Sequence, residues 1–202
     1  NKKALEICDI THETPDPKGG VIGKFDSGEP NGLLFEAEGV LLATNRAFDL
    51  PDLRLKSAFM GFLRHANRFG ITSVGDVFPR GVAKDNAYDL YQALSDDGEL
   101  SARIHFFSEL KNDLEEAAEY RARYCSEKVR FCGLKQFVDG VPENHTGYFL
   151  EPYTDDPGTR GFLAIPEAVL KEMIINADRA GFAVRLHAMG DAAVRLGLDC
   201  FE

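Results

Sequence analysis

From about residue 51, segments with helical hydrophobic spacing alternate with short apolar segments that are typical of strands. The predicted helices cover 53–68, 85–94, 113–124, 166–180 and 192–201, and the predicted strands cover 71–78, 102–107, 129–138 and 183–187. This alternation predicts a parallel sheet, because each helix carries the chain back to the edge where the strand began. A doubly wound sheet and a barrel both satisfy the pattern.

Residues 1–50 lack this alternation. We expect a short helix over 3–10, followed by a β-hairpin whose strands cover 21–25 and 33–36, with turn-forming Asp, Gly and Pro residues between them. A hairpin of this size does not fold alone. We therefore divide the chain at residue 50 into a hairpin segment, 1–50, and an α/β part, 51–202.

Charge and hydropathy argue against two classes of partner. The formal net charge of −10 opposes nucleic-acid binding, which requires a basic face. No apolar run reaches the roughly 20 residues that span a bilayer, so we expect no membrane partner. The cysteines form no CxxC pair, which favours reduced thiols and a cytoplasmic location. They are Cys8, Cys125, Cys132 and Cys200.

Functional side chains of parallel α/β folds lie at the carboxyl ends of the strands. His187 ends one predicted strand, where its imidazole could bind a metal ion; a hydrogen-bonded core histidine fits the position equally well. Gly190 allows a tight turn after it, and Asp191 is placed to cap the next helix. Asp76 lies near the end of another predicted strand, where it either orients a neighbouring side chain or caps a helix.

Lys135 lies inside the predicted strand 129–138. Either this strand forms an exposed edge of the sheet, or the amine is buried, which is costly unless the amine is paired or modified. Burial lowers the pKa of an amine. A neutral lysine can add carbon dioxide and become a carbamate, which is an anionic oxygen ligand for two metal ions.

Asp139 ends the same strand and precedes a long loop, 141–161, that contains His145, Glu151 and Tyr153. About 20 residues without secondary structure are unusual in a compact domain unless the loop is functional. We therefore expect these four residues on the substrate side of a site. The alternative is a solvated surface loop.

Several segments carry a resemblance to a known family: 1–5, 14–20, 28–36, 70–74, Lys135 with 139–140, 151–153 and 187–191. Together and in this order they resemble the amidohydrolase superfamily, and within it the YtcJ-like branch, which includes N-substituted formamide deformylases. The resemblance implies a metal-dependent hydrolase on a (β/α)8 TIM-type barrel. The chain would hold about strands two to five of that barrel, with part of an inserted segment that carries the hairpin.

The resemblance also implies the chemistry and two ligands. One or two divalent metal ions, often zinc, would activate water against an amide or another non-peptide C–N bond of a small-molecule substrate. Lys135 matches the strand-four lysine that is commonly carboxylated and bridges the metal ions. His187 matches the histidine ligand that ends strand five.

Other ligands of the superfamily do not occur in residues 1–202: the His-x-His of strand one, the histidine of strand six and the aspartate of strand eight. The chain also starts without methionine and stops inside a predicted helix, so we expect a piece of a longer enzyme that has no activity by itself. The open edges of a partial barrel favour self-association into a homo-oligomer. The alternative function is a non-catalytic regulatory or binding relative, since catalytic zinc sites usually have three protein ligands.

Overall fold

The computed structural model describes residues 1–18, 20–47, 51–77 and 87–202. The chain forms two compact units, Asn1–Phe62 with Pro79–Leu90 and Leu63–Phe78 with Tyr91–Glu202. The predicted division at residue 50, the end of a predicted strand at Phe78 and the start of a predicted helix at Asp85 lie outside the described residues.

The first unit contains the predicted hairpin. After α1 (Lys2–Ile7), β1 (Val21–Lys24) and β2 (Pro30–Phe35) pair in antiparallel orientation. A helix that we did not predict, α2 (Glu36–Ala47), follows β2 directly and contacts both strands. Its glycine, Gly39, disfavours a helix interior by about 1 kcal/mol relative to alanine, so contacts with the hairpin, rather than local propensity, account for this helix.

The next two helices, α3 (Asp52–Arg68) and α4 (Ala87–Asp96), contribute residues to both units. α3 agrees with the predicted helix to within one residue at its start. Leu63 and Ala66 on α3 are buried in the second unit. Across the described residues, no helix combines the length and the apolar character that a membrane span requires.

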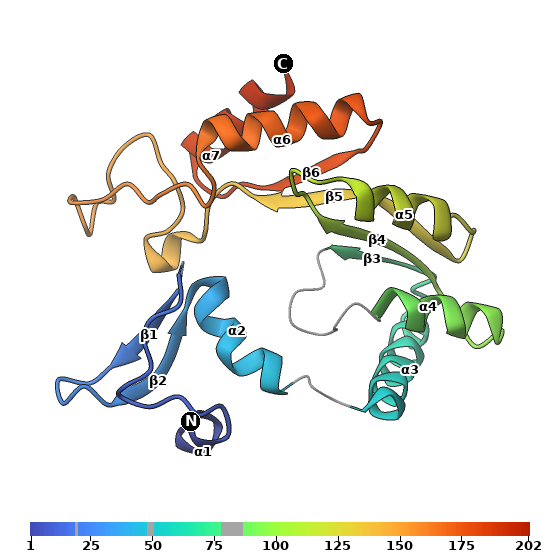
Figure 1. Ribbon diagram of the computed structural model, residues 1–202, viewed down its shortest axis with the longest axis horizontal. Coiled ribbons are helices and arrows are strands. Elements are labelled where there is room, and N and C mark those ends of the chain that lie inside the picture. The colour runs from blue at the N-terminus through green and yellow to red at the C-terminus, as the bar shows by residue number, and fades with distance from the viewer. Residues whose placement is uncertain (19, 48–50, 78–86) are drawn as a thin grey trace. The chain divides into compact units, whose positions relative to one another are not determined.

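The second unit is built on a parallel sheet. Its strands are β3 (Ser73–Val77), β4 (Arg103–Glu109), β5 (Val129–Phe137) and β6 (Val184–His187), hydrogen-bonded in that order. A doubly wound sheet reverses its strand order at a switch point, whereas a barrel keeps the chain order. The observed order and the curl of the sheet in Figure 1 confirm the predicted partial barrel.

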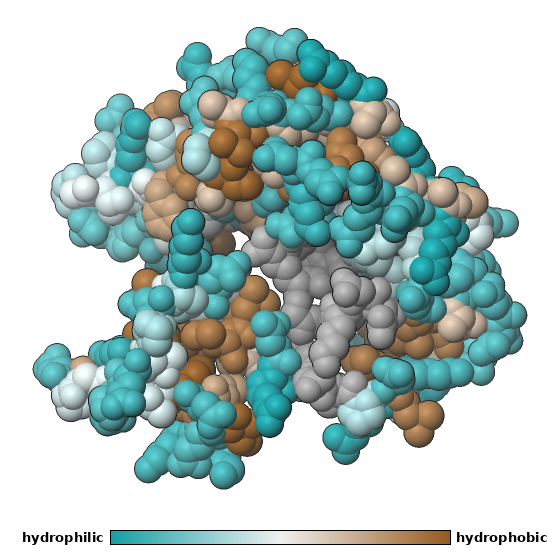
Figure 2. All heavy atoms as spheres, in the orientation of Figure 1, coloured by the Kyte–Doolittle hydropathy of each residue, from teal (hydrophilic) through white to brown (hydrophobic). Residues whose placement is uncertain are grey.

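Helices cover one side of this sheet, which we call the outer side; the opposite side is the inner side. Figure 1 shows α5 (Glu115–Arg123) and α6 (Glu167–Arg179) along the outer side. A short 3-10 helix, η1 (Pro142–Asn144), lies in the long loop after β5, and α7 (Asp191–Phe201) follows β6. In Figure 2 the visible surface over α6 is mostly hydrophilic, as expected for a helix whose buried residues, such as Leu170 and Ile174, face the protein interior.

Aromatic rings form the core between the sheet and α5. Phe106 on β4 is fully buried, and its ring centroid lies 6.2 Å from Tyr120, 5.2 Å from Tyr124 and 5.6 Å from Phe131. Phe131 in turn contacts Phe182, which precedes β6, at 6.1 Å. Burying one such ring stabilises the fold by about 1.5–3 kcal/mol, so this cluster holds α5 against the outer side of the sheet.

Candidate metal centre at the ends of β5 and β6

Lys135 lies on a central strand of the sheet, since β5 is paired with β4 on one side and with β6 on the other. The residue is only 6% exposed. Its Nζ donates to the carbonyl oxygen of Gln136 at 3.0 Å and lies 3.9 Å from the centroid of the Phe137 ring. These positions exclude the alternative of a solvent-exposed lysine on an edge strand.

A bulge in β5 decides which side Lys135 faces. Phe106 on β4 pairs with Phe131, but the next residue, Phe107, pairs with Gly133, so Cys132 is an extra residue in β5. Because side chains alternate along a strand, one extra residue exchanges the two sides for everything that follows. Gly133 accommodates the distortion with φ of 147°, a backbone conformation that favours glycine.

The bulge turns Lys135 to the inner side. Its partners across the ladder are Glu109 on β4 and Arg185 on β6. Phe107 follows Phe106, whose ring packs against Tyr120 of α5, so the Phe107 ring lies on the inner side. The Arg185 guanidinium carbon lies 4.3 Å from the centroid of the Phe107 ring, so Arg185 lies on the inner side too. Without the extra residue, Lys135 would share the helix-covered side with Phe131.

His187 ends β6, as predicted, and is half-buried. Its ring centroid lies 5.1 Å from that of Phe137, and its Nε2 is 3.4 Å from the carbonyl oxygen of Gly140, a long contact for a hydrogen bond. The backbone N–H of Val138 donates to the carbonyl oxygen of His187 at 2.8 Å. The histidine backbone is therefore held by β5, and its ring lies against the same phenylalanine as Lys135.

The strands bring the two candidate ligands to one side of the sheet. Phe137 pairs with His187, and Lys135 precedes Phe137 by two residues, so all three side chains lie on the inner side. A neutral imidazole binds zinc directly, and a lysine amine supplies an oxygen ligand once it is carboxylated. Among the described residues, no three His, Cys, Asp or Glu side chains are grouped to hold a metal ion. These residues therefore fit one part of a metal site.

Asp139 follows β5 and is 2% exposed. Its Oδ2 accepts hydrogen bonds from the backbone N–H groups of Tyr148 and Gly190, both at 2.8 Å, and its Oδ1 accepts one from Met189 at 2.9 Å. Both carboxylate oxygens are thus bound to backbone groups. The residue lies beside the turn that follows His187.

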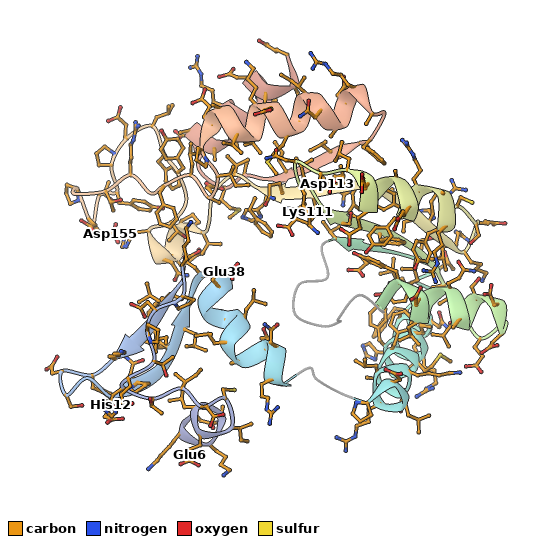
Figure 3. All side chains as sticks on the ribbon, viewed as in Figure 1. Glu6, His12, Glu38, Lys111, Asp113 and Asp155 are labelled. Atoms are coloured by element: carbon orange, nitrogen blue, oxygen red, sulfur yellow. The ribbon has the colours of Figure 1, made fainter. Side chains whose placement is uncertain are left out.

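The loop 141–161 has a defined internal structure. Nε2 of His145 lies 3.1 Å from Oδ2 of Asp155, and the ring of His145 meets that of Tyr153 edge to face at 4.6 Å. The hydroxyl of Tyr153 donates to the carbonyl oxygen of Gly147 at 2.8 Å. Glu151 is exposed. The loop therefore brings His145 and Tyr153 together, and Figure 3 shows Asp155 on it.

Two groups in this loop have shifted pKa values. The hydrogen bond from His145 is the main cause that lowers the pKa of Asp155. Burial raises the pKa of Tyr153, and the negative charges of Asp139 and Asp155 act in the same direction. The phenol therefore stays protonated and remains a hydrogen-bond donor at neutral pH.

Asp76 and Asp191 have identifiable partners. Oδ2 of Asp76 accepts a hydrogen bond from the hydroxyl of Tyr91 on α4 at 2.8 Å, and burial raises the pKa of this carboxyl. Asp191 is the first residue of α7, so the prediction that it is the N-cap is wrong by one residue; Gly190 has that position. Oδ1 of Asp191 accepts from the backbone N–H of Leu150 at 2.8 Å, which links α7 to the long loop.

The sequence did not single out Phe137 or the bulge at 132–133, although both shape the site. Phe137 looked like any apolar strand residue. The only signal of the bulge was a glycine inside an apolar strand, a position where bulges are common.

Known proteins resemble the whole chain. The sequence profile of the amidohydrolase family matches residues 1–202. A putative amidohydrolase, YtcJ, of Bacillus subtilis strain 168 is 28% identical and covers 100% of this chain with 38% of its own length. The N-substituted formamide deformylase of Arthrobacter pascens is 25% identical and covers 100% of this chain with 38% of its own length.

A solved structure shares the fold. The crystal structure of an uncharacterized metal-dependent hydrolase from Pyrococcus horikoshii OT3 matches 100% of this chain and 39% of its own chain, with a TM-score of 0.71 and 24% identity. The chain thus spans about two fifths of the length of the curated relatives it matches.

Proposed function

The chain belongs to the amidohydrolase family, and from this premise we propose that it is the central barrel portion of a metal-dependent enzyme that hydrolyses an amide or another non-peptide C–N bond of a small molecule. One observation carries the proposal. Lys135 and His187 lie on the inner side of adjacent parallel strands, at the carboxyl ends where barrel enzymes build their sites, and both pack against Phe137.

His187 and Lys135 have distinct roles in this proposal. His187 donates a neutral ring nitrogen to the metal ion. The Lys135 amine nitrogen forms a bond to the carbon of carbon dioxide and releases a proton, which leaves a carbamate anion. Its position supports this role, since the side chain is buried on the inner side of the sheet, on the strand next to the one that ends at His187. The carbamate oxygens then serve as metal ligands.

The metal is zinc in this proposal, as one or two ions. When bound, it supplies Lewis-acid activation of water and polarisation of the substrate carbonyl group. Further ligands are needed in this proposal, since the described residues group no three His, Cys, Asp or Glu side chains around a metal ion. Zinc prefers nitrogen and anionic oxygen ligands of the kind that His187 and a carboxylated Lys135 provide.

The loop 141–161 forms the substrate side in this proposal. His145, Glu151 and Tyr153 are its candidates for binding polar groups of a substrate. Tyr153 and His145 are the better placed of the three for a defined geometry, because each has a hydrogen-bond partner that holds its ring. Asp76 and Asp191 orient neighbouring segments through Tyr91 and Leu150. The free thiols of all four cysteines support a cytoplasmic location.

The test uses the full-length protein. We expect stoichiometric divalent metal, and a carbamate signal by NMR after incubation with isotopically labelled bicarbonate. Lys135→Ala should abolish the carbamate signal, and His187→Ala should weaken metal binding about 10-fold or more while the carbamate-forming lysine remains. Arg185→Ala, on the same inner side of β6, is the matched control and should retain the metal.

A full-length protein that contains no stoichiometric metal, and whose amide hydrolysis is indifferent to chelators, would contradict the proposal. That result would favour the non-catalytic regulatory or binding relative. In that case a small molecule would bind without being turned over, and binding would persist in the presence of a chelator.

A further inference from the structure

We propose that Asp139 is a positioning residue that ties the loop 141–161 to the turn after His187 and thereby fixes the direction of the His187 side chain. The observation is the set of backbone contacts made by one buried carboxylate, which we call the Asp139 cluster: Asp139 with the N–H groups of Tyr148, Met189 and Gly190. The proposal rests on the proposed function in that His187 is a metal ligand.

The Asp139 cluster joins segments that are far apart in the sequence. Met189 lies 50 residues beyond Asp139, and Tyr148 lies 9 residues beyond it. The β-ladder between β5 and β6 ends with the pairing of Phe137 and His187. Beyond that pair, the carboxylate of Asp139 continues the connection, because it binds the second and third residues after His187. Asp139 thus holds the two strand ends together where regular pairing stops.

Close packing requires this connection to stay in one arrangement. A Cβ atom built on Gly190 would lie 1.9 Å from the carbonyl oxygen of Tyr148, so the two backbones touch and only glycine fits. That same carbonyl oxygen accepts a hydrogen bond from the N–H of Ala193 at 3.2 Å, and Asp191 binds the N–H of Leu150. The loop and the start of α7 are therefore joined by several backbone contacts, and the Asp139 carboxylate binds both of them.

This geometry argues for a positioning role rather than direct contact with substrate. A carboxylate that binds a substrate needs an oxygen that faces the site, whereas both oxygens of Asp139 accept backbone N–H groups and the residue is 2% exposed. A carboxylate accepts hydrogen bonds at both oxygens. A carboxamide accepts at one oxygen and presents a donor NH2 group at the other position, where it would face another N–H donor.

The experiment compares Asp139→Asn with Asp156→Asn in the full-length protein. Asp156 lies in the same loop and also accepts a backbone N–H bond, from Gly158 at 3.2 Å, but it is exposed and its substitute keeps one acceptor oxygen. Two readouts apply: the visible absorption spectrum and affinity of the cobalt-substituted protein, and hydrogen exchange of the metal-free protein followed by mass spectrometry.

For Asp139→Asn we expect cobalt affinity to fall about 10- to 100-fold, with an altered absorption spectrum that reports changed ligand geometry. We also expect faster exchange in two peptides together, one that covers 147–150 and one that covers 188–193, while a peptide from β4 keeps its protection. Asp156→Asn should leave affinity, spectrum and exchange unchanged.

The two possible failures give different results. Wild-type protein that binds no metal contradicts the proposed function, and joint loss of protection in Asp139→Asn would then still support the connection that Asp139 makes. Wild-type protein that binds cobalt, together with an Asp139→Asn variant of unchanged spectrum and affinity, overturns the positioning role even if the variant melts at a lower temperature. An Asp139→Asn variant in which only one of the two peptides loses protection also overturns it.

Discussion

The Nζ atom of Lys135 lies 3.9 Å from the centre of the Phe137 ring. The aromatic ring therefore forms one wall of the space that the Lys135 amine occupies. The same ring packs against His187 at 5.1 Å, so one phenylalanine is the shared neighbour of both candidate ligands.

Replacement of Phe137 should therefore affect both ligands at once. We expect Phe137→Ala to lower metal affinity of the full-length protein about 10-fold, as other residues that support metal ligands do. Because the ring is half-buried, the loss of stability should be about 1–3 kcal/mol. The amount of metal retained after dialysis against a chelator measures the effect on affinity, and denaturant titration measures the effect on stability. Phe137→Leu keeps most of the side-chain volume, so it should restore stability more than metal affinity. If Phe137→Ala retained all of its metal, Phe137 would not support the two candidate ligands.

The bulge at Cys132 and Gly133 makes a prediction about strand geometry. A Cβ atom on Gly133 would lie 2.3 Å from the carbonyl oxygen of Ala183, and φ is 147°. We expect Gly133→Ala to destabilise the protein by about 3 kcal/mol or more, because it adds a backbone clash to an unfavourable conformation. Gly98→Ala is the matched control, since Gly98 also has positive φ but open space around it; it should cost about 1–2 kcal/mol. Equal losses in the two variants, measured by denaturant titration, would argue against the clash.

Much of the second unit could be predicted because its elements are clearly delimited in the sequence. The predicted strand 129–138 and the observed β5 (Val129–Phe137) differ by one residue, since the charged residues Lys128 and Asp139 flank the predicted strand. The predicted helix 166–180 and α6 (Glu167–Arg179) differ by one residue at each end, because Pro166 and Gly181 flank it. Local chemistry decides such boundaries, so one sequence is sufficient to find them.

The site was less predictable because long-range contacts decide it. The side that Lys135 faces depends on pairing between Phe107 and Gly133, which no local pattern reveals. The position of Asp139 at a strand end predicts a place on the substrate side, whereas its bonds to Met189 and Gly190 depend on how two strands meet. The sequence does not predict α2 for a similar reason, since this helix depends on contacts with the two strands of the hairpin.

The buried aromatic core gives a prediction for stability. Phe106 is 0% exposed, whereas Phe201 on α7 is 56% exposed. We expect Phe106→Ala to lower the free energy of unfolding by about 3–5 kcal/mol, because it leaves a cavity among Tyr120, Tyr124 and Phe131. Phe201→Ala, the matched control, should change it by about 0.5 kcal/mol or less. The two values come from denaturant titration of the full-length protein, and similar losses would show that this ring cluster is not the core.

Sheet edges give a prediction for the 202-residue chain expressed alone. In the described sheet β3 and β6 each have one paired neighbour, so each has a side with unpaired backbone groups. Such edges pair with other chains. We expect this chain to form oligomers that grow with concentration, measured by light scattering, and to show no amide hydrolysis. A monodisperse monomer with a cooperative thermal transition would contradict the first expectation, and chelator-sensitive turnover would contradict the second.

The carboxyl of Asp76 predicts how stability depends on pH. Burial raises its pKa from 3.8, and the hydrogen bond from Tyr91 opposes this shift only in part. An acid whose pKa rises on folding stabilises the protein fully below its unfolded pKa, and this contribution is lost as pH increases through the raised value. Asp76→Asn cannot ionise but still offers Tyr91 an acceptor, so it should be more stable than the wild type at neutral pH. Solvent screening at a half-buried site limits the gain to about 1 kcal/mol or less.

Asp155 provides a comparison for Asp76, because its carboxyl has a lowered pKa whereas that of Asp76 has a raised pKa. His145 lowers the pKa of Asp155, so the ionised form of Asp155 stabilises the protein at neutral pH and this contribution is lost as pH falls through the lowered value. Melting temperatures of both Asn variants, measured from acidic to neutral pH, should therefore diverge from the wild type in opposite directions as pH rises. For Asp76→Asn the gain should vanish below pH 3.8, the unshifted pKa of the carboxyl. A gain that persists there would show that removal of charge is not its cause.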